Sequence, residues 1–175
     1  MNPYLTKNKF IKAFFLDQAV TDIFSTESTL EYYKKYEITL TEVAENLSLI
    51  DTDLALETCT AIKAFQPDMK KIEDSLFVDG LAIPEFVRQL KKHAGDKLKD
   101  CIHLGTTSQD IMDTALVLAI KDVNTIIEDR LNSLCSALDS LTNSFGENII
   151  DGRTRMQKAL LIQAKDRIIT WKTPL

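Results

Sequence analysis

Apolar residues recur at steps of three and four along the C-terminal half of the chain, which is the spacing of one face of an α-helix. This run predicts a single helix over residues 110–145, about 54 Å long at about 1.5 Å per residue. Its apolar positions are Leu116, Ile120, Val123, Ile127, Leu131, Leu134, Leu138, Leu141 and Phe145. A helix of this length is typical of a bundle, in which neighbours of similar length cover its apolar face.

Shorter helices are expected before it. The same spacing predicts a helix over residues 28–50 with Thr26 or Ser28 as its N-cap, and one charged residue, Glu37, interrupts its apolar face. A second helix is expected over residues 52–65. It ends before the next proline, because the residue preceding a proline is pushed out of the α region.

Turn and cap residues place the remaining helices. Asp68 can cap a third helix, and Asp79-Gly80 marks the turn that follows it. Pro84 suits the first turn of a fourth helix that continues over residues 85–93. A last helix is expected over residues 158–171.

The composition supports an all-α fold. The 175 residues include only 5 Gly and 4 Pro, too few turn formers for an architecture of many short strands. We therefore expect an N-terminal helical domain over residues 1–105 and the start of a long-helix bundle over residues 106–175. Few other segments are long enough to partner the helix over residues 110–145, so this bundle is expected to be truncated.

Charge and cysteine content exclude several classes of protein. The 26 acidic residues outnumber the 21 basic ones and no long basic block is present, so nucleic-acid binding is not expected. No stretch approaches the roughly 20 apolar residues of a membrane span, and the N-terminal apolar cluster is too short for a signal-peptide core. We expect a cytoplasmic protein without membrane contact. The three cysteines are far apart, which predicts neither a disulfide framework nor a metal site.

One candidate site directly precedes the long helix. Residues 103–110 bring His103 together with three consecutive hydroxyl residues at a helix N-terminus, where free N–H groups and the helix dipole favour an anion. His103 can donate a hydrogen bond to that anion or move a proton. The alternative is plain helix initiation, because Thr106 and Gln109 have the spacing of a capping box, with His103 as an ordinary loop residue. The candidate ligands are Thr106, Thr107, Ser108 and Gln109.

A second candidate site lies in residues 151–158. Two guanidinium groups, a hydroxyl and an amide occur close together, which suits bidentate binding of a carboxylate. The alternative is a solvated, charge-rich loop. The candidate residues are Arg153, Thr154, Arg155 and Gln157.

Together these segments resemble the fumarase, aspartase and adenylosuccinate lyase superfamily. Residues 103–111, followed by Asp113-Thr114-Ala115, are similar to its first signature region, whose usual form is His-x-Gly-x-Thr-Ser-x-Asp with a downstream Asp-Thr. Residues 152–160 resemble the second region. There fumarases and adenylosuccinate lyases generally place a His where this chain has Arg155, and the branch of bacterial 3-carboxy-cis,cis-muconate cycloisomerases does not. The resemblance therefore favours that branch, which acts in the breakdown of aromatic compounds. Relatives usually have Pro where Leu161 stands.

The resemblance implies a function and a division of labour. The family reaction is addition or elimination next to a carboxylate, without a cofactor, in a homotetramer built on a bundle of the long helices. Here Thr107, Ser108, Arg153, Thr154 and Gln157 would hold the carboxylates of a small tricarboxylate or dicarboxylate, and His103 would orient or protonate it. The family's serine base lies on a Ser-Ser-x-x-Met-Pro loop that these 175 residues do not contain.

These implications predict a truncated, cycloisomerase-like chain that is inactive alone and self-associates through the long helix. Three alternatives remain. The first is a non-catalytic helical binding or assembly module. The others are a half-enzyme completed by another chain and an adenylosuccinate lyase-like fragment.

Overall fold

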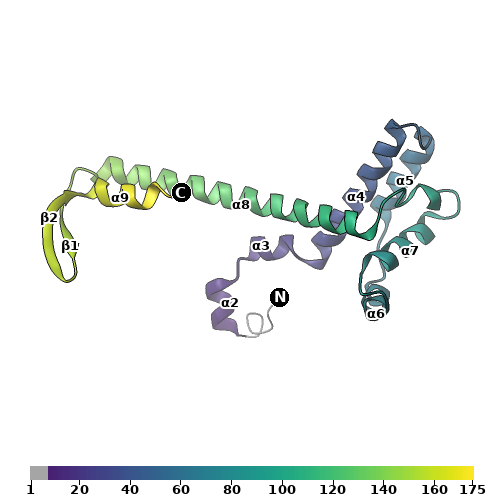
Figure 1. Ribbon diagram of the computed structural model, residues 1–175, viewed down its shortest axis with the longest axis horizontal. Helices are drawn as coiled ribbons and strands as arrows, with labels where there is room; N and C mark the ends of the chain where they lie inside the picture. Colours follow the sequence, from purple (N-terminus) through teal and green to yellow (C-terminus); the bar gives the residue numbers. More distant parts are fainter. Residues whose placement is uncertain (1–7) are drawn as a thin grey trace. The chain divides into compact units, whose positions relative to one another are not determined.

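The computed structural model of the protein describes residues 8–175, so the first seven residues of the predicted N-terminal domain lie outside it. The chain divides into two compact units between Asp122 and Val123, and one long helix, α8 (Ser108–Phe145), contributes residues to both. The predicted boundary between residues 105 and 106 stays a prediction. The predicted all-helical fold with one long helix is confirmed, and one small hairpin is added to it (Figure 1).

The first unit consists of short helices and the beginning of α8. Before α8 come α2 (Lys9–Phe15), α3 (Gln18–Ile23), α4 (Thr26–Asn46), α5 (Thr52–Ala64), α6 (Met69–Asp79), α7 (Ile83–Ala94) and the single 3-10 turn η1 (Lys99–Cys101). The predicted helices over residues 52–65 and 85–93 are confirmed as α5 and α7. Asp68 caps α6 as predicted, since its carboxylate accepts the N–H of Lys71 at 3.3 Å.

The helix predicted over residues 28–50 has different ends. Its N-cap is Ser25, whose hydroxyl accepts the N–H of Ser28 at 3.1 Å, so the predicted caps Thr26 and Ser28 are wrong. The helix α4 ends at Asn46, and Ser48 then takes a left-handed backbone with φ 57° that no helix continues through. The apolar spacing in the sequence continues past Ser48, so it could not locate the end of this helix.

The core of the first unit lies between α5, α6, α7 and the residues on either side of the loop that opens α8. Its buried side chains are Ile62, Phe65, Ile72, Ile83, Phe86, Val87, Leu90, Ile102 and Ile111. Phe86 is fully buried, and its ring meets those of Tyr33 and Phe65 edge to face, with centroids 5.5 and 5.6 Å away. The core therefore anchors both sides of the loop that opens α8, through Ile102 before the loop and Ile111 in the first turn of α8.

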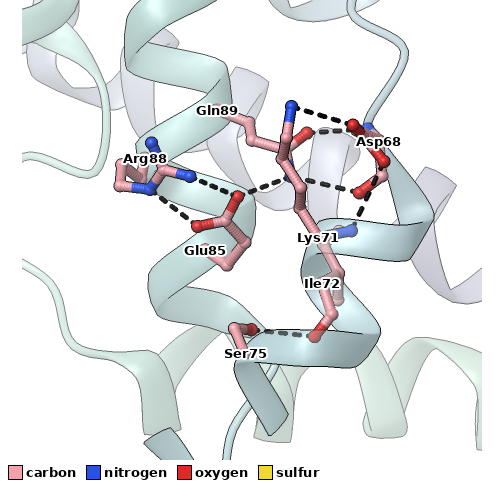
Figure 2. Close-up of polar contacts among 7 residues, drawn as sticks. All are labelled: Asp68, Lys71, Ile72, Ser75, Glu85, Arg88 and Gln89. Carbon is pink, nitrogen blue, oxygen red and sulfur yellow. Dashed lines mark hydrogen bonds and ion pairs between the residues drawn. The ribbon is translucent and has the colours of Figure 1, made fainter. Parts of the chain in front are cut away.

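Polar contacts join the start of α6 to α7 (Figure 2). The Gln89 side chain accepts the N–H of Asp68 at 2.7 Å and donates to the carbonyl of the same residue at 3.1 Å. Beside it, Arg88 donates two hydrogen bonds of 2.6 Å to the nearly buried carboxylate of Glu85. These bonds hold the pKa of Glu85 below its ordinary value. The network satisfies the polar groups that this helix packing takes out of water.

The second unit corrects one prediction. The helix expected over residues 158–171 begins only at Ala164, because the preceding residues form a strand: β1 (Ile149–Thr154) and β2 (Gln157–Gln163) pair as an antiparallel hairpin, and α9 (Ala164–Lys172) follows. Local periodicity could not reveal this pairing, since it depends on a two-residue turn at Arg155-Met156 with φ 56° at Met156. In Figure 1, α9 lies beside the last part of α8.

Within residues 8–175 no helix is both long enough and apolar enough to cross a bilayer.

Candidate functional site

The loop between η1 and α8 carries the first group of predicted site residues. Two of its residues have left-handed backbones, His103 with φ 57° and Gly105 with φ 67°. Glycine adopts this conformation without cost, whereas for a side chain such as histidine it costs roughly 1–2 kcal/mol. A specific interaction must therefore stabilise His103 in this conformation.

That interaction is a buried carboxylate on α4. The Glu37 side chain is fully buried, and both of its oxygens contact the same residue. Oε2 accepts the backbone N–H of His103 at 2.9 Å, and Oε1 lies 2.6 Å from its Nδ1. One carboxylate thus fixes the backbone and the ring of His103 together, and the ring is only 13% exposed.

A second contact from α4 supports the other end of the loop. The hydroxyls of Tyr36 and Thr106 are hydrogen-bonded to each other, and Thr106 also donates to Asp110 Oδ2 at 3.2 Å. The same oxygen accepts the N–H and the hydroxyl of Thr107, each at 2.8 Å. These bonds, those from Thr107 foremost, lower the pKa of Asp110. Asp110 is therefore ionised at neutral pH and stabilises the start of α8, and this contribution is lost as the pH falls through the lowered pKa.

The capping arrangement differs from the predicted one. Thr107 precedes α8 and pairs with Asp110 three residues on, whereas the predicted box paired Thr106 with Gln109. The amide of Gln109 instead donates to Asp113 at 2.6 Å along the helix. The predicted capping box is wrong by one residue, because an ionised aspartate is the stronger acceptor at a helix N-terminus.

This arrangement leaves a small set of donors available for a ligand. Within residues 8–175, no hydrogen bond involves the Ser108 hydroxyl or the backbone N–H groups of Ser108 and Gln109. Thr106 and Thr107 donate to Asp110. Of the four predicted ligands in this loop, Ser108 is the one whose side chain has no partner inside the described chain.

The second group of predicted site residues lies at the turn of the hairpin. Arg153 and Thr154 end β1, Arg155 lies in the turn, and Gln157 begins β2 opposite Thr154. All four are exposed.

Charge pairing within the hairpin leaves its two guanidinium groups available. Lys158, opposite Arg153 in the register, pairs with Asp151 at 2.7 Å. In the described part of the chain neither Arg153 nor Arg155 has an ion-pair partner. Two guanidinium groups on one turn can bind planar carboxylates through paired N–H donors.

Gly152 is required by the close approach of the two strands. A Cβ built on Gly152 would lie 2.6 Å from the carbonyl oxygen of Leu160 on β2, nearer than any side chain can come. The register shifts at this point, so that Gly152 stands against two residues of β2. The bulge bends β1 just before Arg153 and so changes the direction of the residues that follow.

The structure thus gathers His103, Thr106, Thr107, Ser108 and Gln109 at one place in the first unit, and Arg153, Thr154, Arg155 and Gln157 at one place in the second. The sequence did not identify Tyr36 and Glu37 as parts of the first group. A signal for Glu37 was present, because a charge inside an apolar helix face is buried only with a partner. Within residues 8–175 no three His, Cys, Asp or Glu side chains gather as metal ligands would.

Comparisons with known proteins cover most of the chain, including both groups of site residues. A family model described as "Lyase" matches residues 52–164. The chain is 28% identical to 3-carboxy-cis,cis-muconate cycloisomerases of Acinetobacter baylyi and Pseudomonas putida; the matches cover 90% and 87% of this chain but 36% and 37% of theirs. Its structure is similar to that of a fumarate lyase from a Mesorhizobium species, with a TM-score of 0.84 and 33% identity over 91% of this chain and 37% of that one. The chain therefore spans a little over a third of the length of these relatives.

Proposed function

Because the chain belongs to the lyase family, as its two signature segments predicted, we propose that it is the carboxylate-binding part of a cycloisomerase-like enzyme of the fumarate lyase superfamily. Its ligand would be a small tricarboxylate such as 3-carboxy-cis,cis-muconate. The family reaction removes or adds a proton next to a carboxylate, and donors fixed in advance at the developing negative charge lower its barrier.

One observation carries this proposal: the donors at the start of α8 are held in place but unused within the described chain. The Ser108 hydroxyl and two N–H groups lie at the positive end of a helix, in the segment that also carries His103. The hydroxyls of Thr106 and Thr107 would act indirectly, by fixing Asp110 and the first turn. Arg153 and Arg155, with Thr154 and Gln157, would bind further carboxylates.

The family's serine base belongs to a Ser-Ser-x-x-Met-Pro loop, and no such sequence occurs in the 175 residues. We therefore propose that this chain binds the substrate without turning it over. Conversion of 3-carboxy-cis,cis-muconate by the purified chain alone would refute the proposal that it binds the substrate without catalysing the reaction.

Titration calorimetry tests the binding site. The wild-type chain is expected to bind a tricarboxylate, and Ser108→Ala is expected to weaken binding about 10- to 100-fold, because a hydrogen bond to a charged group is worth about 1.5–3 kcal/mol. Ser133→Ala is the matched control: Ser133 is an exposed serine of the same helix whose hydroxyl donates to the backbone carbonyl of Asp129. Equal affinities of the wild type and Ser108→Ala would show that the start of α8 is not the binding site.

A second candidate function is assembly through α8, as a helical module or as the partner of another chain that completes the site. Large apolar side chains of α8 remain between 44% and 63% exposed, and exposed apolar surface of this kind is typical of a contact with another protein surface. They are Leu116, Val117, Ile120, Ile127, Leu134, Leu141 and Phe145. Because the family assembles through its long helices, we propose that the covering surface is a second copy of this chain.

Sedimentation analysis tests the self-association. The wild type is expected to sediment as a dimer or larger, and Ile127→Lys is expected to shift it towards the monomer, because a charge would have to be desolvated in the contact. Glu128→Lys places the same lysine at the neighbouring exposed position and is expected to leave the association unchanged. A wild type that stays monomeric at the highest concentration reached would exclude this assembly.

A further inference from the structure

The buried carboxylate behind His103 determines what its ring can do. An ionised carboxylate only accepts hydrogen bonds, and a neutral imidazole has a single N–H. Since Glu37 Oε1 lies 2.6 Å from Nδ1, the proton of the neutral ring belongs on Nδ1. The lone pair is then on Nε2, for which the described chain provides no hydrogen-bond partner.

We propose that Glu37 is a positioning residue: it holds His103 in its left-handed backbone conformation and in the Nδ1–H tautomer, and so makes Nε2 the nitrogen that receives a proton. The 2.9 Å hydrogen bond from the His103 N–H to Oε2 stabilises the left-handed backbone conformation. The contact between Oε1 and Nδ1 fixes the tautomer. Because both bonds come from one buried side chain, the ring can gain or lose a proton at Nε2 without moving.

The Nδ1–H tautomer limits how His103 can bind a carboxylate ligand, given the proposed function. A neutral ring would present a lone pair to an anion, which is repulsive. His103 can therefore bind a carboxylate only after Nε2 takes a proton from solvent, with Glu37 balancing the charge of the imidazolium. The charged groups near the ring are Glu37 from α4, which contacts Nδ1, and Asp110 from α8, whose lowered pKa is due in small part to His103.

One substitution separates the tautomer from the fold. In Glu37→Gln the amide can turn so that its oxygen accepts the His103 N–H and its NH2 donates to Nδ1. Both bonds then remain, but the ring must carry its proton on Nε2. The variant is thus expected to fold as the wild type does and to reverse the tautomer.

The chain is well suited to this measurement, because it contains only two histidines, His93 and His103. Nitrogen NMR of histidine-labelled protein, at a pH where both rings are neutral, reports which nitrogen of each carries the proton. We expect His103 in the Nδ1–H form in the wild type and in the Nε2–H form in Glu37→Gln. His93, exposed on α7, should be the same in both and serves as the internal reference. An Nε2–H form of His103 in the wild type would overturn the proposal.

Calorimetry in buffers of different ionisation enthalpy tests the consequence, with citrate as the tricarboxylate probe. At a pH where the NMR experiment finds both rings neutral, binding by the wild type should take up about one proton, and binding by Glu37→Gln should take up nearly none. Equal proton uptake in the two proteins would contradict the role assigned to Nε2. If neither protein binds a tricarboxylate, the proposed function fails, whereas the tautomer result, obtained without ligand, still decides the role of Glu37.

Discussion

Replacing His103 with alanine is expected to lower the free energy of unfolding by about 2–4 kcal/mol, because the fully buried Glu37 carboxylate loses the donor that Nδ1 of the ring provides. The Glu37 carboxylate is fully buried and would keep a single donor, the backbone N–H of residue 103. Alanine also adopts the left-handed backbone of this position poorly. Urea denaturation followed by circular dichroism at neutral pH measures the loss.

Three further variants assign its cause. His103→Asn keeps a residue that tolerates the left-handed conformation, so its smaller loss isolates the backbone contribution. Adding Glu37→Gln to His103→Ala removes the buried charge and should recover part of the stability. His93→Ala alters an exposed histidine whose ring contacts that of Phe65, and it is expected to cost less than about 1 kcal/mol. A His103→Ala variant as stable as His93→Ala would contradict the structural role assigned to the pair.

The contact between Glu37 and His103 also shows where sequence interpretation ends. Periodicity revealed that Glu37 interrupts an apolar face, and composition at the loop singled out His103 as a candidate for chemistry. Neither pattern could join them, because 66 residues separate the two positions and the pairing depends on how α4 packs beside the loop. The same limit applies to Tyr36, whose partner Thr106 lies 70 residues away.

Features that depend only on neighbouring residues were predicted correctly. Asp68, Pro84 and the helices they begin were placed correctly, since caps and first turns depend on neighbouring residues. The strand over Gln157–Gln163 was missed for the opposite reason. Its apolar residues fit a helix equally well, and only pairing with β1 across the turn at Arg155 and Met156 makes it a strand.

Replacing Phe86 with alanine is expected to cost about 3–5 kcal/mol, the usual loss for truncating a buried aromatic side chain. Phe86 is fully buried and packs edge to face on two further rings, so the cavity cannot close without moving Tyr33 and Phe65. This loss is a large part of the roughly 5–15 kcal/mol that stabilises an ordinary domain. Denaturant unfolding measures it, and Phe77→Ala is the control, because that phenylalanine is 93% exposed.

The same substitution should reach the binding loop. Ile102 and Ile111 belong to the core cluster of Phe86, and they bracket the segment that carries His103 and Ser108. A loosened core is therefore expected to raise the hydrogen-exchange rate of the His103 amide, which is protected by its bond to Glu37. Unchanged exchange at His103 in a destabilised Phe86→Ala variant would mean that Glu37 holds the loop independently of the core. Faster exchange of the His103 amide would instead show that the conformation of the carboxylate site depends on the core around Phe86.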